Sequence, residues 1–128
     1  MAITRFYTVQ EAQEKLREIR PLVSELRELK AACHRRGYDV YRHQYFGGMG
    51  PNGQKVFPSE MERIVVIVQA LDADGIQVKD LDRGLIDFPH RRANGEIVLL
   101  CYLDGEPEIV QWHPLEGGFR DRRDLSEL

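Results

Sequence analysis

The stretch KDLDRGLIDFP, Lys79–Pro89, joins a densely charged turn to an apolar strand. It holds three carboxylates and two cations beside a glycine, and it then runs directly into Leu85, Ile86 and Phe88. Charges at this density need partners, a ligand or open water, because an ion buried without a partner costs several kcal/mol. Asp87 lies inside the apolar run, so we expect its carboxylate to be hydrogen-bonded, paired, or shifted in pKa.

Around this stretch, the sequence shows the period of two that is typical of strands. Strand-like runs cover residues 76–79, 85–90, 97–103 and 108–113. Asn94-Gly95 is the pair favoured in tight hairpins, and Asp104–Pro107 is a second turn signal. We therefore predict an antiparallel β-meander of three to four strands over residues 76–113, followed by a C-terminal arm at residues 114–128.

The hairpin turn decides which residues share a face of this sheet. If Asn94-Gly95 forms a two-residue turn, Phe88 pairs with Cys101 and His90 pairs with Leu99. The predicted core face then carries Ile86, Phe88, His90, Leu99, Cys101, Leu103, Val110 and Trp112. The predicted opposite face carries Leu85, Asp87, Val98, Leu100, Tyr102, Ile109, Gln111 and His113. Such an apolar second face predicts a homodimer with a two-fold contact.

The predicted register also indicates whether the candidate metal ligands lie close enough together to share one ion. Cys101 and His113 fall on opposite predicted faces, so they would not share one ion. Asp87 and His113 share a face but are about four residues apart along the strands, roughly 13 Å at about 3.3 Å per residue. We therefore expect no metal and no other cofactor, and the alternative is a divalent ion at Asp82, Asp87 and His113.

A long helix is predicted before the sheet. Thr8 and Glu11 have the spacing of a capping box, and apolar residues then recur every three or four positions over residues 12–33. Pro21 interrupts this pattern and predicts a kink, because it removes a helical hydrogen bond and collides with the preceding turn. Gly37 is the expected end of the helix, although the aromatic spacing also allows a continuation to about Tyr45.

A second capping-box pattern, Ser59–Glu62, begins a helix that Asp74-Gly75 ends. Residues 37–58 are rich in glycine and aromatic side chains, and they form either a helix end with a mobile loop or an aromatic lid over a pocket. We predict a single α+β domain, residues 1–128. An antiparallel two-helix hairpin, residues 8–74, packs on one face of the meander.

The composition and the lengths of the apolar runs argue against several classes of function. The 128 residues are 42% hydrophobic and 30% charged with a net charge of -3, so a broad basic surface for nucleic acid is not expected. The first residues do not form a signal peptide, and the longest apolar run, Ile64–Val68, is too short to span a membrane. We expect a cytoplasmic protein in which Cys33 and Cys101 are buried thiols.

The charged loop and the strand ends supply the candidate site residues. Asp87 and His113 are the candidate catalytic acid and base, because histidine titrates near neutral pH. The structural alternative pairs Asp82 and Asp87 with Arg83, Lys79 or an arginine of the tail. The expected ligand-binding residues are Lys79, Asp80, Asp82, Arg83, Asp87, Glu106, Trp112, His113 and Arg122.

Several short motifs occur together along the chain: Phe6-Tyr7-Thr8, Glu11-Ala12, Arg20-Pro21-Leu22, Gly75–Pro89, Leu100-Cys101-Tyr102, Gly105-Glu106-Pro107, Trp112-His113 and Gly117-Gly118-Phe119. In this combination they resemble the prokaryotic family known as domain of unknown function 2203. Tyr102 departs from the family pattern, which has tryptophan there, and so does the segment 37–58. The resemblance implies the predicted fold and a candidate surface, and it implies no activity.

We therefore expect a cytoplasmic, homodimeric binding or regulatory module with a polar site around residues 79–87 and an unknown small-molecule or protein partner. The alternative is a small enzyme, hydrolase-like or metal-assisted, that uses Asp87 and His113 as acid and base. A third hypothesis is an RNA-associated factor, which is disfavoured by the net charge. That factor would use Arg91, Arg92, Arg120, Arg122 and Arg123.

Overall fold

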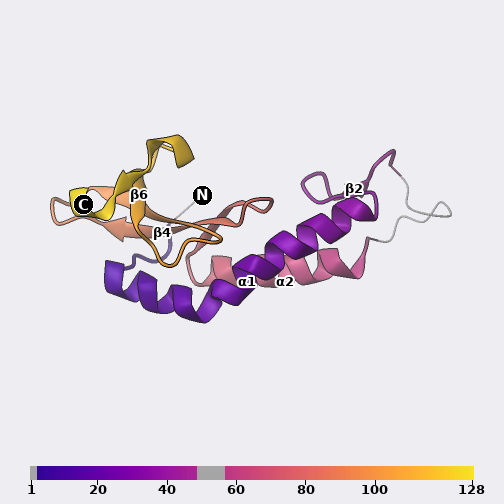
Figure 1. Ribbon diagram of the computed structural model, residues 1–128, viewed down its shortest axis with the longest axis horizontal. Helices are drawn as coiled ribbons and strands as arrows, with labels where there is room; N and C mark the ends of the chain where they lie inside the picture. The colour runs from indigo at the N-terminus through magenta and orange to yellow at the C-terminus, as the bar shows by residue number, and fades with distance from the viewer. Residues whose placement is uncertain (1–2, 49–56) are drawn as a thin grey trace.

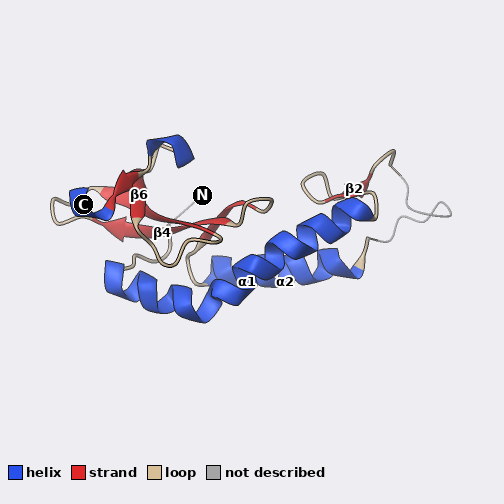
Figure 2. Cartoon of the chain, viewed as in Figure 1, coloured by secondary structure: helices blue, strands red, loops and turns tan. Residues whose placement is uncertain are grey.

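The computed structural model describes residues 3–48 and 57–128, and these form two α-helices and two antiparallel sheets (Figures 1 and 2). The α+β class agrees with the prediction, but the strand count does not. The larger sheet has five strands in the order β3-β4-β5-β6-β7, and the smaller one pairs β1 with β2. Neither of the described helices has the length and apolar composition of a membrane span.

The helices and the first hairpin are α1 (Val9–Arg35), β1 (Tyr38–Asp39), β2 (Gln44–Tyr45) and α2 (Ser59–Ala73). The main sheet contains β3 (Gln77–Asp80), β4 (Leu85–Arg91), β5 (Ile97–Leu103), β6 (Gln111–Pro114) and β7 (Arg123–Asp124). Two short 3-10 helices, η2 (Phe119–Asp121) and η3 (Leu125–Glu127), flank β7. The tail, predicted as a loop or arm, therefore adds a strand to the sheet edge.

Helix α1 begins at the predicted capping box. The amide of Glu11 donates to Thr8 Oγ1 at 3.0 Å, and the amide of Thr8 donates to Glu11 Oε1 at 2.8 Å. The helix continues through Pro21 for 27 residues and ends before Gly37, whose φ of +76° is favourable for glycine. Its buried side chains are Ala12, Leu16, Ile19, Val23, Leu26 and Cys33.

Helix α2 ends as predicted but begins differently. Pro58 occupies the N-cap position and has no side-chain oxygen, so the predicted capping box at Ser59–Glu62 is wrong. Residues 64–68 are helical, and Gly75 follows the helix end with φ +78°. Between the helices, β1 pairs with β2, so α1 does not continue to about Tyr45; residues 49–56 of the predicted loop or lid lie outside the described residues.

The β4–β5 hairpin corrects the predicted register. The amide of Arg92 donates to the Glu96 carbonyl at 2.8 Å, which leaves a three-residue loop with Gly95 at φ +89° instead of a two-residue turn. As a result Phe88 pairs with Leu100, and Asp87 pairs with Cys101. A shift of one residue moves every side chain of a strand to the other face relative to its partner.

The β5–β6 connection shifts the register in the same way. A turn closes at Glu106, whose amide donates to the Leu103 carbonyl at 3.0 Å, but β6 begins only at Gln111, and α1 holds the residues between them. Gln13 accepts from the amide of Ile109 at 2.9 Å and donates to the Ile109 carbonyl at 2.7 Å. Leu100 consequently pairs with Trp112, and Leu99 pairs with His113.

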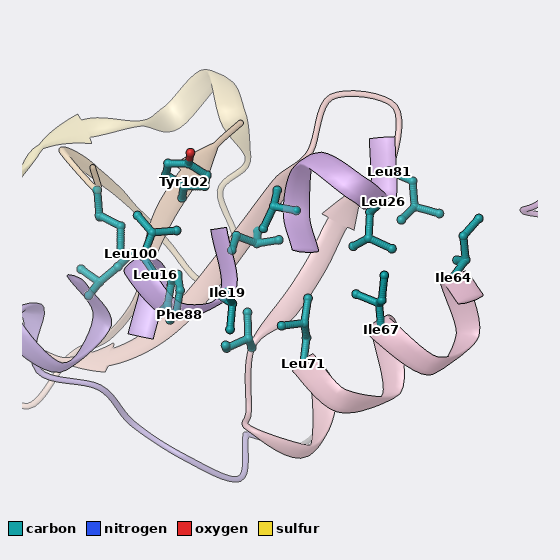
Figure 3. Close-up of a cluster of buried hydrophobic side chains, with 14 of the residues drawn as sticks. Leu16, Ile19, Leu26, Ile64, Ile67, Leu71, Leu81, Phe88, Leu100 and Tyr102 are labelled. Carbon is teal, nitrogen blue, oxygen red and sulfur yellow. The ribbon is translucent and has the colours of Figure 1, made fainter. Parts of the chain in front are cut away.

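The two faces of the sheet therefore differ from the predicted ones. The helix-side face carries Ile86, Phe88, Val98, Leu100, Tyr102 and Trp112, and these belong to one apolar cluster with α1 and α2 (Figure 3). The opposite face carries Leu85, Asp87, Leu99, Cys101 and His113, which are also buried. The residues predicted to form a dimer face include Val98, Leu100 and Tyr102, which lie in the core of a single chain.

Candidate functional site

Three side chains with metal-ligand or acid–base chemistry meet on the face of the sheet opposite the helix-side face. Asp87 comes from β4, Cys101 from β5 and His113 from β6, and one ligand atom of each lies within 4.8 Å of the others. They are 1%, 0% and 3% exposed, respectively. We call these three residues the polar cluster.

The corrected register explains this convergence. Asp87 stands directly opposite Cys101, and His113 stands opposite Leu99, one alternation further along β5. The carboxylate and the imidazole both extend over β5, so Asp87 Oδ2 and His113 Nε2 are 3.0 Å apart. The predicted separation of roughly 13 Å was wrong, and so was the prediction that Cys101 and His113 lie on opposite faces.

His113 has both ring nitrogens in hydrogen bonds. Its Nδ1 lies 2.8 Å from the Pro114 carbonyl, which can only accept, so Nδ1 carries a proton and Nε2 faces Asp87. Burial lowers the pKa of His113, but the hydrogen bond and charge of Asp87 together with the Pro114 carbonyl raise it more. The net effect is a raised pKa, which favours an imidazolium–carboxylate pair.

Cys101 shares this environment. Burial raises the pKa of its thiol, and the negative charge of Asp87 raises it further. The thiol therefore remains protonated at neutral pH unless a cation compensates the charge of the thiolate. A hydrogen bond to the Asp87 carboxylate also contributes to the raised pKa of Cys101. By distance and angle, the buried Asp87 Oδ1 has no hydrogen-bond partner among the described residues.

The part of the C-terminal segment around η2 lies on this side of the sheet, since η2 and the helices are on opposite sides in Figure 2. Arg122 donates through Nη2 to both carboxylate oxygens of Glu106, at 2.7 and 2.9 Å, and lies 3.4 Å from the Cys101 carbonyl. The guanidinium groups of Arg122 and Arg83 each lie 4.9 Å from the ring centroid of Phe119. The tail is thus anchored next to the polar cluster.

The structure brings together only part of the predicted ligand-binding set. Lys79 lies close enough for its charge to oppose protonation of His113, and Glu106 and Arg122 pair beside Cys101. Trp112 belongs to the helix-side face, where its indole nitrogen donates to the Asp124 carbonyl. It is therefore not part of the polar cluster.

The side chains of the predicted polar loop, residues 79–87, do not gather in one site. Asp80 pairs with Arg83 at 2.8 Å, and Asp82 pairs with Lys30 of α1 at 2.8 Å. A cavity of about 430 Å³ lies at this junction with α1, lined by Ser24, Arg27, Glu28, Ala31, Asp82 and Asp104. The alternative metal set of Asp82, Asp87 and His113 is therefore not assembled, and the partner of Asp87 is His113, not Arg83, Lys79 or a tail arginine.

Cys101 is the site residue that sequence reasoning missed. The sequence did contain a usable signal, because Phe88, Leu100 and Trp112 are large apolar residues that a core would gather on one face. Their immediate neighbours then all fall on the other face. Those neighbours include Asp87, Cys101 and His113.

The model of the family described as uncharacterized conserved protein (DUF2203) matches residues 5–125, so the chain belongs to this family. No curated protein and no solved structure matches the chain.

Proposed function

We propose that this protein is a binding module whose ligand site is the polar cluster of Asp87, Cys101 and His113. The proposal is based on the incomplete hydrogen bonding of the buried Asp87 carboxylate. One of its carboxylate oxygens, Oδ1, has no hydrogen-bond partner among residues 3–48 and 57–128, and the residue is 1% exposed.

An unpaired oxygen on a buried carboxylate is costly. Leaving a buried polar atom unsatisfied costs about 1–3 kcal/mol, and more when the group is charged. The pairing with His113 uses only Oδ2. A ligand that interacts with Oδ1 would recover part of this cost, so the cluster gains stability from being occupied.

The same geometry favours binding over acid–base catalysis. A general acid or base needs a nitrogen or oxygen within hydrogen-bond reach of the substrate. In His113, Nδ1 faces the Pro114 carbonyl and Nε2 faces Asp87, so both nitrogens are already in use. The enzyme alternative would require this pair to separate before a substrate could react.

The experiment measures the Tm of the purified full chain against a panel of divalent metal salts, inorganic phosphate and small carboxylic acids. The comparison protein is the double variant Asp87→Leu/His113→Leu, which makes the cluster apolar. A ligand present at about 100 times its Kd adds about 2.7 kcal/mol of stability, which raises Tm by roughly 8 °C. We expect such a rise for at least one compound in the natural chain and not in the double variant.

Two outcomes contradict the proposal. One is that no compound of the panel raises the Tm of the natural chain. The other is an equal rise in both proteins, which would locate binding away from the cluster.

The RNA-associated alternative receives less support from the arginine side chains. Arg122 has an 8% exposed side chain that pairs with Glu106. Arg92 and Arg123 both lie over the ring of Trp112, at 4.9 and 5.4 Å from its centroid. Arginines held in this way are less able to reach a phosphate backbone.

We propose a cytoplasmic, prokaryotic, homodimeric protein in which α1 bends at Pro21 and forms an antiparallel hairpin with α2. The ion pairs Lys15–Asp74 and Glu25–Arg63 support opposite helix directions, because the order of the partners is reversed along the two elements. A dimer would use a surface other than the predicted sheet face.

A further inference from the structure

The composition of the polar cluster narrows the class of ligand. Its donors are a carboxylate oxygen, a sulfur and an imidazole nitrogen, all within 4.8 Å of one another. Around a tetrahedral ion with bonds of about 2.0–2.3 Å, neighbouring donors are about 3.5 Å apart. Small side-chain adjustments are therefore enough to place all three donors on one ion.

We propose that Asp87, Cys101 and His113 bind a divalent transition-metal ion of the Zn²⁺ class. This inference rests on the binding role proposed above and names its ligand. Thiolate and imidazole donors suit Zn²⁺ and Co²⁺, whereas Mg²⁺ and Ca²⁺ prefer sites made only of oxygen.

The orientation of His113 supports this assignment. In metal sites the ligating histidine usually donates its other ring N–H to a carbonyl or carboxylate, which fixes the tautomer. His113 has this arrangement, because Nδ1 lies 2.8 Å from the Pro114 carbonyl and Nε2 points toward Asp87. The lone pair of Nε2 is then available to an ion as soon as its proton leaves.

The charge balance selects a divalent ion. Without metal, the cluster holds a protonated thiol and one proton between Asp87 and His113. Binding of M²⁺ releases these two protons and leaves a thiolate, a carboxylate and a neutral imidazole around the ion. The site then has no net charge, which matters because an uncompensated charge is costly at residues that are at most 3% exposed.

Asp87 Oδ1 provides the second, independent observation. This oxygen is buried and has no hydrogen-bond partner in the described part of the chain. Coordination would engage the carboxylate without requiring another hydrogen-bond donor. Three protein donors leave a fourth position for water or another small ligand, as in zinc sites that are not purely structural.

The test uses the full-length chain after treatment with a chelator and removal of that chelator. Co²⁺ is added and the absorption spectrum is recorded. We expect visible bands typical of tetrahedral cobalt, together with a near-ultraviolet thiolate-to-cobalt band, and both should disappear when Zn²⁺ is added in stoichiometric amount.

Matched variants assign the ligands. Cys101→Ser should abolish the thiolate band, whereas Cys33→Ser, which changes the other fully buried cysteine, should retain it. Asp87→Asn and His113→Gln should each weaken Co²⁺ binding at least tenfold. Loss of the band in Cys33→Ser, or its persistence in Cys101→Ser, would overturn the assignment.

A second measurement needs no variant. X-ray absorption of the Zn²⁺-loaded natural chain should show one sulfur at about 2.3 Å and nitrogen or oxygen neighbours at about 2.0–2.2 Å. A shell without sulfur, or no Zn²⁺ retained after dialysis, would refute the metal proposal. If a compound other than a metal then stabilises the natural chain but not the Asp87→Leu/His113→Leu variant, the binding role remains valid without the metal.

Discussion

The helix-side face of the sheet and the opposite face, which carries the polar cluster, are built by neighbouring residues of the same strands. The three neighbouring pairs are Phe88 with Asp87, Leu100 with Cys101, and Trp112 with His113. All six residues are at most 3% exposed. Burial therefore does not distinguish the candidate site from the core. The two faces differ in their surroundings. Phe88, Leu100 and Trp112 pack against apolar side chains, whereas the charges of Asp87 and His113 must be neutralised within the polar cluster.

The largest expected effect is on the helix-side face. Phe88→Ala should destabilise the chain by about 3–5 kcal/mol, because a fully buried aromatic side chain leaves a cavity. Urea unfolding measures this change. Phe6→Ala is the control, since Phe6 is 37% exposed and should cost less than about 1 kcal/mol. Equal costs for the two variants would mean that Phe88 is not in the core.

Substitutions in the polar cluster should affect stability differently, because the effect of removing Asp87 depends on whether His113 is present. In the presence of a chelator, Asp87→Leu should cost about 3 kcal/mol by removing the partner of His113. The double variant Asp87→Leu/His113→Leu should be more stable than the sum of the single effects predicts, by up to about 3 kcal/mol. Chemical denaturation of the four proteins completes this cycle, and additive effects would show that the two side chains do not interact.

A smaller effect tests the turn that creates both faces. Gly95→Ala should cost about 1 kcal/mol, because φ is +89° and side chains with a Cβ are unfavourable there. Gly118→Ala is the matched control, since φ is -132° and a Cβ would meet open space. Thermal unfolding should rank Gly95→Ala clearly below Gly118→Ala, and the reverse order would contradict the three-residue loop.

The smallest expected change in stability concerns Glu25 and Arg63, an exposed ion pair that serves as a reference for the buried Asp87–His113 pair. The hydrogen bond from Arg63 lowers the pKa of Glu25, and both side chains are about a third or more exposed. The stabilisation is present above the ordinary glutamate pKa of about 4.3 and is lost as pH falls through the lowered value. Glu25→Gln should therefore differ slightly from the natural chain at pH 7 and converge with it in acid, as measured by urea unfolding. A difference that persists below the lowered pKa would exclude this cause.

Local signals in the sequence were reliable where one segment decided the outcome. The capping box of Thr8 and Glu11 and the glycines after both helices correspond to the observed helix ends. Pro58 shows the limit of such signals, because the helix began one residue earlier than the serine pattern implied. The strands were predicted in nearly the right places, but their register depended on a loop length that Asn94-Gly95 alone does not specify.

Sequence patterns alone were enough to specify the α+β class, the helix positions, the alternation within each strand and the isolation of Asp87 among apolar residues. Tertiary structure decided which strand residues lie opposite one another, since Gln13 of α1 holds Ile109 and sets the second connection. Register is a relation between segments distant in sequence, and a single-residue shift exchanges the two faces. One such shift in each of the two connections is why Cys101 and His113, expected on opposite faces, lie in one cluster with Asp87.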